Sequence, residues 1–226
     1  MEKTDKQVKV CVFDICGTLY QSNTTFDFLD FLFRENKKYI WYKRIYKSSP
    51  WRLLNKILRV YFDVDLTRML ALKFLKGFCK EELQSLAEEF YNQFLDQRRN
   101  NNVLQVLEEK LNNKNFRVIL LSATIDVVAN VIAQKLNCNE FYSTTLKYNN
   151  GKCTGEISND MLGKKQQFIK ELNLVPSIEL FVTDDISDIN VLDLSRNRII
   201  VVYYKNKNQW KRILKQKKWN VELLEV

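Results

Sequence analysis

Short apolar runs rich in β-branched residues recur along the chain and predict buried strands. Apolar runs without polar alternation are typical of parallel sheets, which helices cover on both faces. Helical patterns separate the later runs, and this alternation indicates right-handed βαβ crossovers in an α/β fold. The predicted strands cover residues 8–14, 116–122, 178–183 and 198–204, and the predicted helices between the last three cover residues 126–136 and 164–172.

Residues 21–100 interrupt this alternation. We find no run in this segment that is typical of a strand, and apolar residues recur at helical spacing, for example at Leu83, Leu86 and Phe90. The segment is therefore predicted to be an all-helical insert after the first strand. Further along, an Asn-Asn-Gly sequence between two extended runs predicts a β-hairpin within residues 143–157.

The absence of histidine restricts the chemistry more than any other count. A chain of 226 residues is long enough for one sizeable domain, or for a core domain that carries an insert. Without histidine, it cannot build a Ser-His-Asp triad, a Cys-His dyad or a His-ligated zinc site within itself. An enzyme with this sequence would rely on carboxylates, Lys, Cys, Tyr and hydroxyl groups.

The net charge and the cysteine pattern indicate which partners and which cellular compartment to expect. Lys and Arg number 36 and Asp and Glu 27, so the net charge is +9 and anionic partners are favoured. The five cysteines are scattered without a CxxC pair, which argues against a disulfide scaffold or zinc ribbon and favours a reducing cytoplasm. Residues 1–10 contain no apolar leader, and no later segment has about 18 uninterrupted apolar residues. We therefore expect a soluble, cytoplasmic protein.

Polar residues gather at the carboxyl ends of the predicted strands, where open parallel sheets bind their ligands. Each one alone could simply cap the following helix. Their recurrence in one order along a single chain favours a shared site instead. The residues are Asp14, Ser122, Thr183, Asp184, Asp185 and Asp188.

These positions resemble the four motifs of the haloacid dehalogenase (HAD) superfamily of hydrolases. The sequence DICGTL at residues 14–19 is similar to the first motif, and LSA at residues 121–123 is similar to the second. The pair KK at residues 164–165 opens a helix where the family places its third-motif lysine, and VTDDISD at residues 182–188 resembles the acidic fourth motif. The resemblance spans residues 8–204 and points to the phosphoserine-phosphatase-like branch, subfamily IB.

The resemblance implies a three-layer α/β/α, Rossmann-like core with a parallel sheet. Residues 1–20 and 101–226 would form this core domain, and residues 21–100 would form a helical C1 cap. It also implies a phosphatase that uses Mg²⁺ and hydrolyses a phosphate monoester through an aspartyl-phosphate intermediate. The partner would be a small phosphorylated substrate, free or lipid-linked.

The resemblance further implies a role for each motif residue. Asp14 would be the nucleophile. The magnesium ion would be bound by Asp14, Asp184 and the backbone carbonyl of Cys16, while Asp188 supports this shell.

The resemblance implies that residues of the second and third motifs bind the phosphate. Ser122 and the backbone amides that follow it, beginning with Ala123, would bind phosphoryl oxygens at the start of a helix. A lysine would offset the remaining charge. Both Lys164 and Lys165 are candidates, and the apolar spacing along the helix favours Lys165.

Cys16 departs from the family pattern, which has a second Asp at this position to protonate the leaving oxygen and then to deprotonate water. A thiol has a pKa of about 8.5, and neighbouring carboxylates disfavour the thiolate further. Loss of a positioned acid/base group typically lowers the rate ~10²–10⁴-fold. The sequence therefore allows a weakened phosphatase, or a catalytically impaired module of the same fold that binds a phosphate or a lipid head group.

The insert contains a basic segment with interleaved aromatic residues. Residues 34–59 carry nine Lys or Arg and one acidic residue, together with two Trp and several Tyr. This segment could select an anionic substrate, lie on a membrane surface as a peripheral contact, or form a solvated basic face. The basic stretch at residues 205–218 leaves the same alternatives open. No nucleic acid partner is expected, and the pattern does not specify an oligomeric state.

Overall fold

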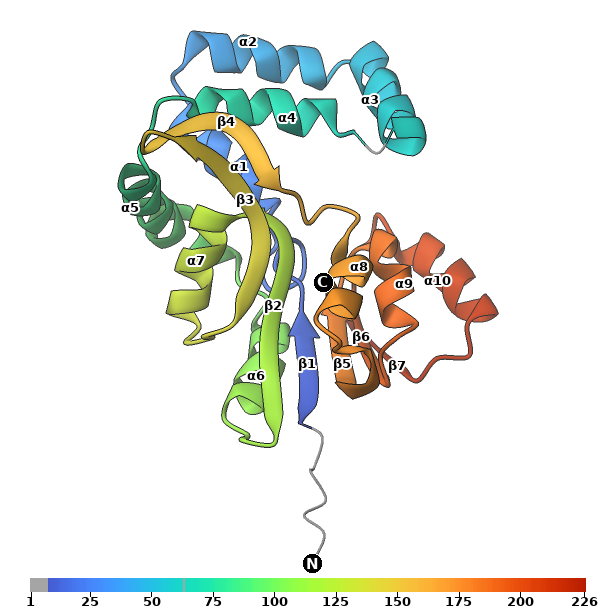
Figure 1. Ribbon diagram of the computed structural model, residues 1–226. Coiled ribbons are helices and arrows are strands. Elements are labelled where there is room, and N and C mark those ends of the chain that lie inside the picture. Colours follow the sequence, from blue (N-terminus) through green and yellow to red (C-terminus); the bar gives the residue numbers. More distant parts are fainter. Residues whose placement is uncertain (1–7, 63) are drawn as a thin grey trace, which may run out of the picture.

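The computed structural model describes residues 8–62 and 64–226 of the chain (Figure 1). Residues 1–7, which begin the predicted core segment and the stretch without an apolar leader, lie outside the described residues. At the centre is a seven-stranded sheet in the order β4-β3-β2-β1-β5-β6-β7. The strands are β1 (Lys9–Phe13), β2 (Phe116–Ile125), β3 (Phe141–Asn149), β4 (Lys152–Asn159), β5 (Ile178–Thr183), β6 (Asn197–Val202) and β7 (Val221–Glu225).

The apolar runs of the sequence form β1, β2, β5 and β6, and all four pair in parallel. The Asn-Asn-Gly turn joins β3 to β4 in an antiparallel hairpin, as predicted. Some strand ends differ from the prediction: β2 continues to Ile125, beyond its predicted end at Ser122, and β6 ends at Val202, before its predicted end at Tyr204. β7 was not predicted, because this short edge strand is largely exposed and lacks a continuous apolar run.

Helices cover both faces of the sheet (Figure 1). Cys11 and Phe13 of β1 face one side and join a core cluster with α6 and α7, whereas Val10 and Val12 face the other side with α8, α9 and α10. Burial on both faces explains the unbroken apolar runs of the central strands. The predicted three-layer α/β/α core is confirmed. Its helices are α6 (Asn101–Leu111), α7 (Asp126–Lys135), α8 (Lys165–Glu171), α9 (Ile189–Leu192) and α10 (Lys207–Gln216).

The insert between β1 and β2 is helical, and its helices α2, α3 and α4 lie beyond the carboxyl end of the sheet (Figure 1). Backbone bonds tie it to the hairpin: the Gly77 amide donates to the Cys153 carbonyl, and the Cys153 amide donates to the Phe78 carbonyl, each at 2.8 Å. The division into core and cap at residues 20 and 100 stays a prediction. The insert helices are α1 (Thr24–Leu32), α2 (Lys37–Tyr46), α3 (Ser49–Phe62), α4 (Leu66–Leu72) and α5 (Lys80–Phe90).

In the part of the chain that the structure describes, we see no helix with the length and apolar character needed to cross a membrane. All five cysteines are free thiols.

Candidate active site

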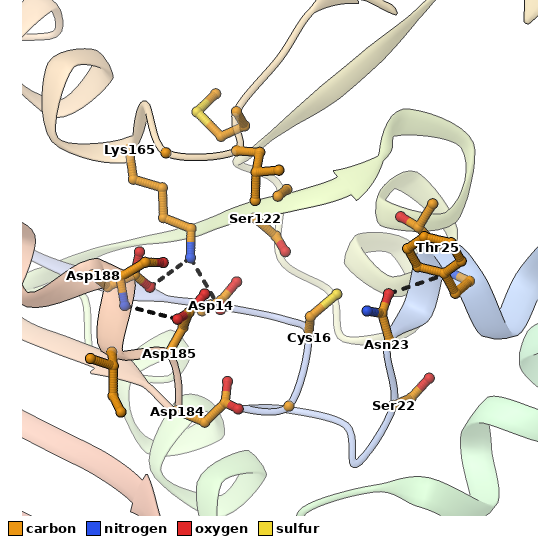
Figure 2. A pocket seen from close by; sticks show the side chains of 18 of the residues that line it. Asp14, Cys16, Ser22, Asn23, Thr25, Ser122, Lys165, Asp184, Asp185 and Asp188 are labelled. Carbon is orange, nitrogen blue, oxygen red and sulfur yellow. Dashed lines mark hydrogen bonds and ion pairs between the residues drawn. The ribbon is translucent and has the colours of Figure 1, made fainter. Parts of the chain in front are cut away.

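A cleft of about 760 Å³ lies between the carboxyl ends of the strands and the helical insert. The strand order places β1 between β2 and β5, so the residues that follow these three strands converge on the cleft floor. Figure 2 shows the labelled side chains around it, with Lys165 between two carboxylates. The cleft is lined by Asp14, Cys16, Ser122, Ala123, Lys165, Asp184 and Asp188 from the predicted motifs.

Asp14 lies directly after β1 and is 3% exposed. Its Oδ1 accepts a hydrogen bond of 2.7 Å from the Ile15 amide, and its Oδ2 lies 3.1 Å from Lys165 Nζ. Burial raises the pKa of Asp14 to about 6, and the Lys165 ammonium limits this rise. Around neutral pH the carboxylate is therefore ionised, partly desolvated and held in a fixed orientation.

Lys165 is the first residue of α8 and is buried, with Nζ 2.8 Å from Asp188 Oδ2 as well as close to Asp14. Burial alone would lower the pKa of Lys165, but the two carboxylates raise it above its ordinary range, so the ammonium stays charged. Lys164 is exposed and does not line the cleft. Of the two candidate lysines, the structure thus brings Lys165 to the site.

The fourth-motif residues follow β5. Thr183 Oγ1 donates to Asp188 Oδ2 at 2.7 Å, which positions Asp188 against Lys165. Asp184 faces the cleft, and its Oδ1 accepts a 3.1 Å bond from Thr18 Oγ1. Burial, together with the charges of Asp14 and Asp185, raises the pKa of Asp184 to about 7. Negative charge is thus concentrated on this side of the cleft.

Gly17 lets the loop after β1 pass close to Asp184. Its φ is +69°, and a Cβ at this position would lie 2.3 Å from Asp184 Oδ2. Only glycine combines that backbone conformation with that approach. The Gly17 carbonyl also accepts a 2.7 Å bond from the Tyr203 hydroxyl, which follows β6 and which the sequence did not single out.

The motif residues converge as the HAD resemblance implies, and the sequence pattern of the haloacid dehalogenase-like hydrolase family matches residues 11–193. The chain belongs to this family. A search of curated proteins finds no match to this HAD hydrolase.

Solved structures show how closely this HAD hydrolase follows known folds. A protein of unknown function from Bordetella pertussis Tohama I is 19% identical, with a TM-score of 0.70 over 95% of this chain and 98% of that chain. A phospho-aspartyl intermediate analogue of phosphoserine phosphatase is 19% identical, with a TM-score of 0.61 over 96% and 93%. Cytosolic 5′-nucleotidase IIIB bound to cytidine is 12% identical, with a TM-score of 0.61 over 96% and 80%. These likenesses show the fold, and the phosphoserine-phosphatase-like branch stays a prediction.

The residues around Asp14 and Asp184 fit a magnesium ion by their donor chemistry. Burial and, next to it, the Asp14 charge raise the pKa of Asp184, and a cation near both carboxylates would relieve their repulsion. Across residues 8–62 and 64–226, no three His, Cys, Asp or Glu side chains group closely enough to form a metal site by themselves. Two carboxylates and the Cys16 carbonyl would leave the other positions to water and substrate, an arrangement that Mg²⁺ commonly adopts.

Cys16 lines the cleft of the HAD site, and its thiol lies in a small hydroxyl cluster. Its Sγ is 2.7 Å from Thr24 Oγ1 and 3.1 Å from Thr124 Oγ1, and these two oxygens are 2.6 Å apart. Burial, with a further contribution from the Asp14 charge, raises the pKa of Cys16. The side chain therefore remains a neutral thiol at neutral pH. No local pattern in the sequence indicates either threonine, because they lie eight and 108 residues away from Cys16.

Ser122 and Ala123 line the cleft, but no helix begins directly after them. β2 continues to Ile125 and α7 begins at Asp126, where the predicted helix 126–136 begins, so Ser122 and Ala123 lie in β2 ahead of the helix start. Pairing of β2 with β3 is irregular between Leu121 and Ile125, so the strand is locally distorted there. The Ser122 hydroxyl accepts a bond from the Thr124 amide at 3.3 Å.

Arg68 brings the insert into contact with the core at the rim of the site. It is 5% exposed, lines the cleft and lies on α4. Its guanidinium donates to Asp160 Oδ1 at 2.6 Å, to the Ala123 carbonyl and to Thr144 Oγ1 at 2.8 Å. The sequence did not single out Arg68, because its partners are 55 to 92 residues away.

Proposed function

We propose that this HAD hydrolase is a Mg²⁺-dependent phosphatase that hydrolyses a phosphate monoester through an aspartyl-phosphate on Asp14. The observation that carries the proposal is the Asp14 carboxylate, fixed on the cleft floor 3.1 Å from the buried Lys165 ammonium. A phosphoryl group entering the cleft would meet a nucleophile and a permanent positive charge together. Membership of a hydrolase family supports this reaction class.

In the first step, an Asp14 oxygen bonds to phosphorus, the ester P–O bond breaks and the alcohol leaves with a proton. Lys165 offsets charge on the transferring group, and the Ser122 hydroxyl is available as a donor to a phosphoryl oxygen. A bound Mg²⁺, held by Asp14, Asp184 and the Cys16 carbonyl, would supply Lewis-acid stabilisation of phosphoryl charge. In the second step, water bonds to phosphorus, the bond to Asp14 breaks and phosphate is released.

Cys16 affects the two steps unequally. A departing alkoxide would take the thiol proton and leave a thiolate, but a phenolate departs without that proton. With an aryl phosphate the Cys16 thiol therefore stays neutral through the first step and cannot accept a proton from water in the second step until it is ionised. The raised pKa of Cys16 disfavours that ionisation. We therefore expect the second step to limit turnover and the aspartyl-phosphate to accumulate.

Phenol release from an aryl phosphate tests the proposal. With Mg²⁺, the wild type should show a burst of about one equivalent of phenol per enzyme followed by slow turnover, and EDTA or Asp14→Asn should abolish both. Cys16→Asp should raise steady-state turnover ~10²-fold or more, because it restores a group that accepts a proton. Cys16→Ser is the matched control and should leave turnover low. Turnover in Asp14→Asn equal to that of the wild type would refute the assignment of Asp14 as the nucleophile.

The neutral thiol of Cys16, whose pKa is raised by burial and by the Asp14 charge, favours one alternative, a catalytically impaired module that binds a phosphate or a lipid head group. Under this alternative, inorganic phosphate would still bind in a Lys165-dependent manner, yet no burst would appear with Mg²⁺. Failure of Cys16→Asp to restore any turnover would support the module over the enzyme.

A further inference from the structure

Exposed apolar side chains gather on one part of the insert. Of the eleven large hydrophobic side chains that are exposed among the described residues, seven lie between residues 41 and 70. Single exposed hydrophobic residues are ordinary, whereas a cluster marks a contact surface. The seven are Trp41, Leu53, Leu54, Ile57, Tyr61, Met69 and Leu70.

Helix α3 turns its apolar face away from the protein. Leu53, Ile57 and Tyr61 recur every four residues and therefore share one face, with exposed fractions of 61%, 42% and 76%. The inward side carries Trp51, Asn55 and Leu58, and the Asn55 side chain bonds to Asp65 and to the Thr67 amide. An exposed apolar face of this kind is not expected for a helix on the surface of a globular protein.

Positive charge borders this apolar face. Arg52 and Lys56 lie on α3 between the exposed apolar face and the inward side, and Arg44 and Lys47 precede the helix. None of these four is within 4 Å of an acidic side chain that the structure describes. An exposed apolar stripe with cations at its border and aromatic rings nearby is typical of a helix that lies in a membrane interface.

We propose that α3 docks the protein on an anionic lipid surface, with Leu53, Ile57 and Tyr61 entering the interface and Arg52 and Lys56 binding lipid head groups. The charge favours lipid over a second copy of the chain. Two such faces in a symmetric dimer would bring the same cations together, whereas anionic head groups neutralise them. Arg59 of α3 lines the cleft, so the docked helix would place the cleft mouth close to the membrane.

Vesicle co-sedimentation tests this proposal on the full chain. The wild type should bind vesicles of phosphatidylcholine mixed with phosphatidylglycerol, bind pure phosphatidylcholine at least tenfold more weakly, and lose binding as salt rises. Leu53→Ser/Ile57→Ser should reduce binding to the mixed vesicles at least tenfold. Arg52→Gln/Lys56→Gln should reduce it about fivefold for each charge removed.

Matched controls keep the test specific. Leu223→Ser removes an exposed leucine on β7, and Lys211→Gln/Lys215→Gln removes two exposed lysines on α10; both should bind vesicles as the wild type does. Asp14→Asn should also bind normally, so docking and catalysis can fail separately. Unchanged circular dichroism and thermal unfolding would show that the α3 variants remain folded.

Three outcomes would overturn the proposal. They are absence of binding to the mixed vesicles, binding that the α10 double variant removes as strongly as the α3 variants do, and a dimer in light scattering that Leu53→Ser/Ile57→Ser dissociates. The last result would show that the face joins two copies of the chain.

Discussion

Replacing Asp184 by Asn should stabilise the metal-free protein at neutral and alkaline pH. The pKa of Asp184 is raised from 3.8 to about 7 in the folded protein. The folded state therefore retains a proton that the unfolded state has released between about pH 4 and pH 7. Stability of the metal-free wild type falls as pH rises through this window, because ionised Asp184 is then buried beside Asp14. Asn carries no charge, and it can still accept the bond from Thr18.

The size of the effect follows from the shift. About three pKa units at ~1.4 kcal/mol each give an upper bound of about 4 kcal/mol, and partial solvation of the side chain lowers this to roughly 2–4 kcal/mol. For a chain of this length, the same change corresponds to a rise in Tm of about 4–16 °C.

Urea unfolding followed by tryptophan fluorescence in EDTA measures this difference. The free energy of unfolding of Asp184→Asn should exceed that of the wild type by the full roughly 2–4 kcal/mol at pH 8, and the two free energies should become equal below pH 4. Asp185→Asn is the matched control, since Asp185 is exposed and should change stability far less. Added Mg²⁺ should stabilise the wild type but not Asp184→Asn. An Asp184→Asn protein no more stable than the wild type at pH 8 would refute the argument from buried charge.

Two further substitutions test the geometry around the cleft. Gly17→Ala should lower the free energy of unfolding by about 1–3 kcal/mol and reduce Mg²⁺-dependent activity, because its Cβ would displace Asp184. Gly151→Ala is the control: its φ is +74° and no atom lies within 4 Å of the added Cβ, so it carries only the backbone strain. Equal effects of the two substitutions in unfolding and activity assays would exclude a close-packing role for Gly17. Arg68→Met should destabilise the protein by about 3 kcal/mol in urea unfolding, because it leaves three polar partners without their donor. Lys73→Met removes an exposed ion pair between the insert and the hairpin and should cost far less, and a comparable loss would argue against a special role for Arg68.

Local patterns in the sequence determined the core of the fold. The apolar runs of β1, β2, β5 and β6 are buried on both faces, so their hydrophobicity directly reports their environment. The Asn-Asn-Gly turn fixed the hairpin through the backbone conformation it requires. β7 was not predicted, because an edge strand that is exposed to solvent needs no apolar pattern. Its pairing with β6 depends on backbone groups.

The polar residues of the site could also be predicted from the sequence, because most of them lie at or near the carboxyl ends of strands that share one edge of the sheet. Only the tertiary structure decided between the two lysines: Lys165 points to Asp14, and Lys164 to solvent. It likewise decided the setting of Cys16, whose hydroxyl partners come from the insert and from β2. Contacts between residues 8 to 108 positions apart depend on how elements pack, and no local pattern encodes that packing.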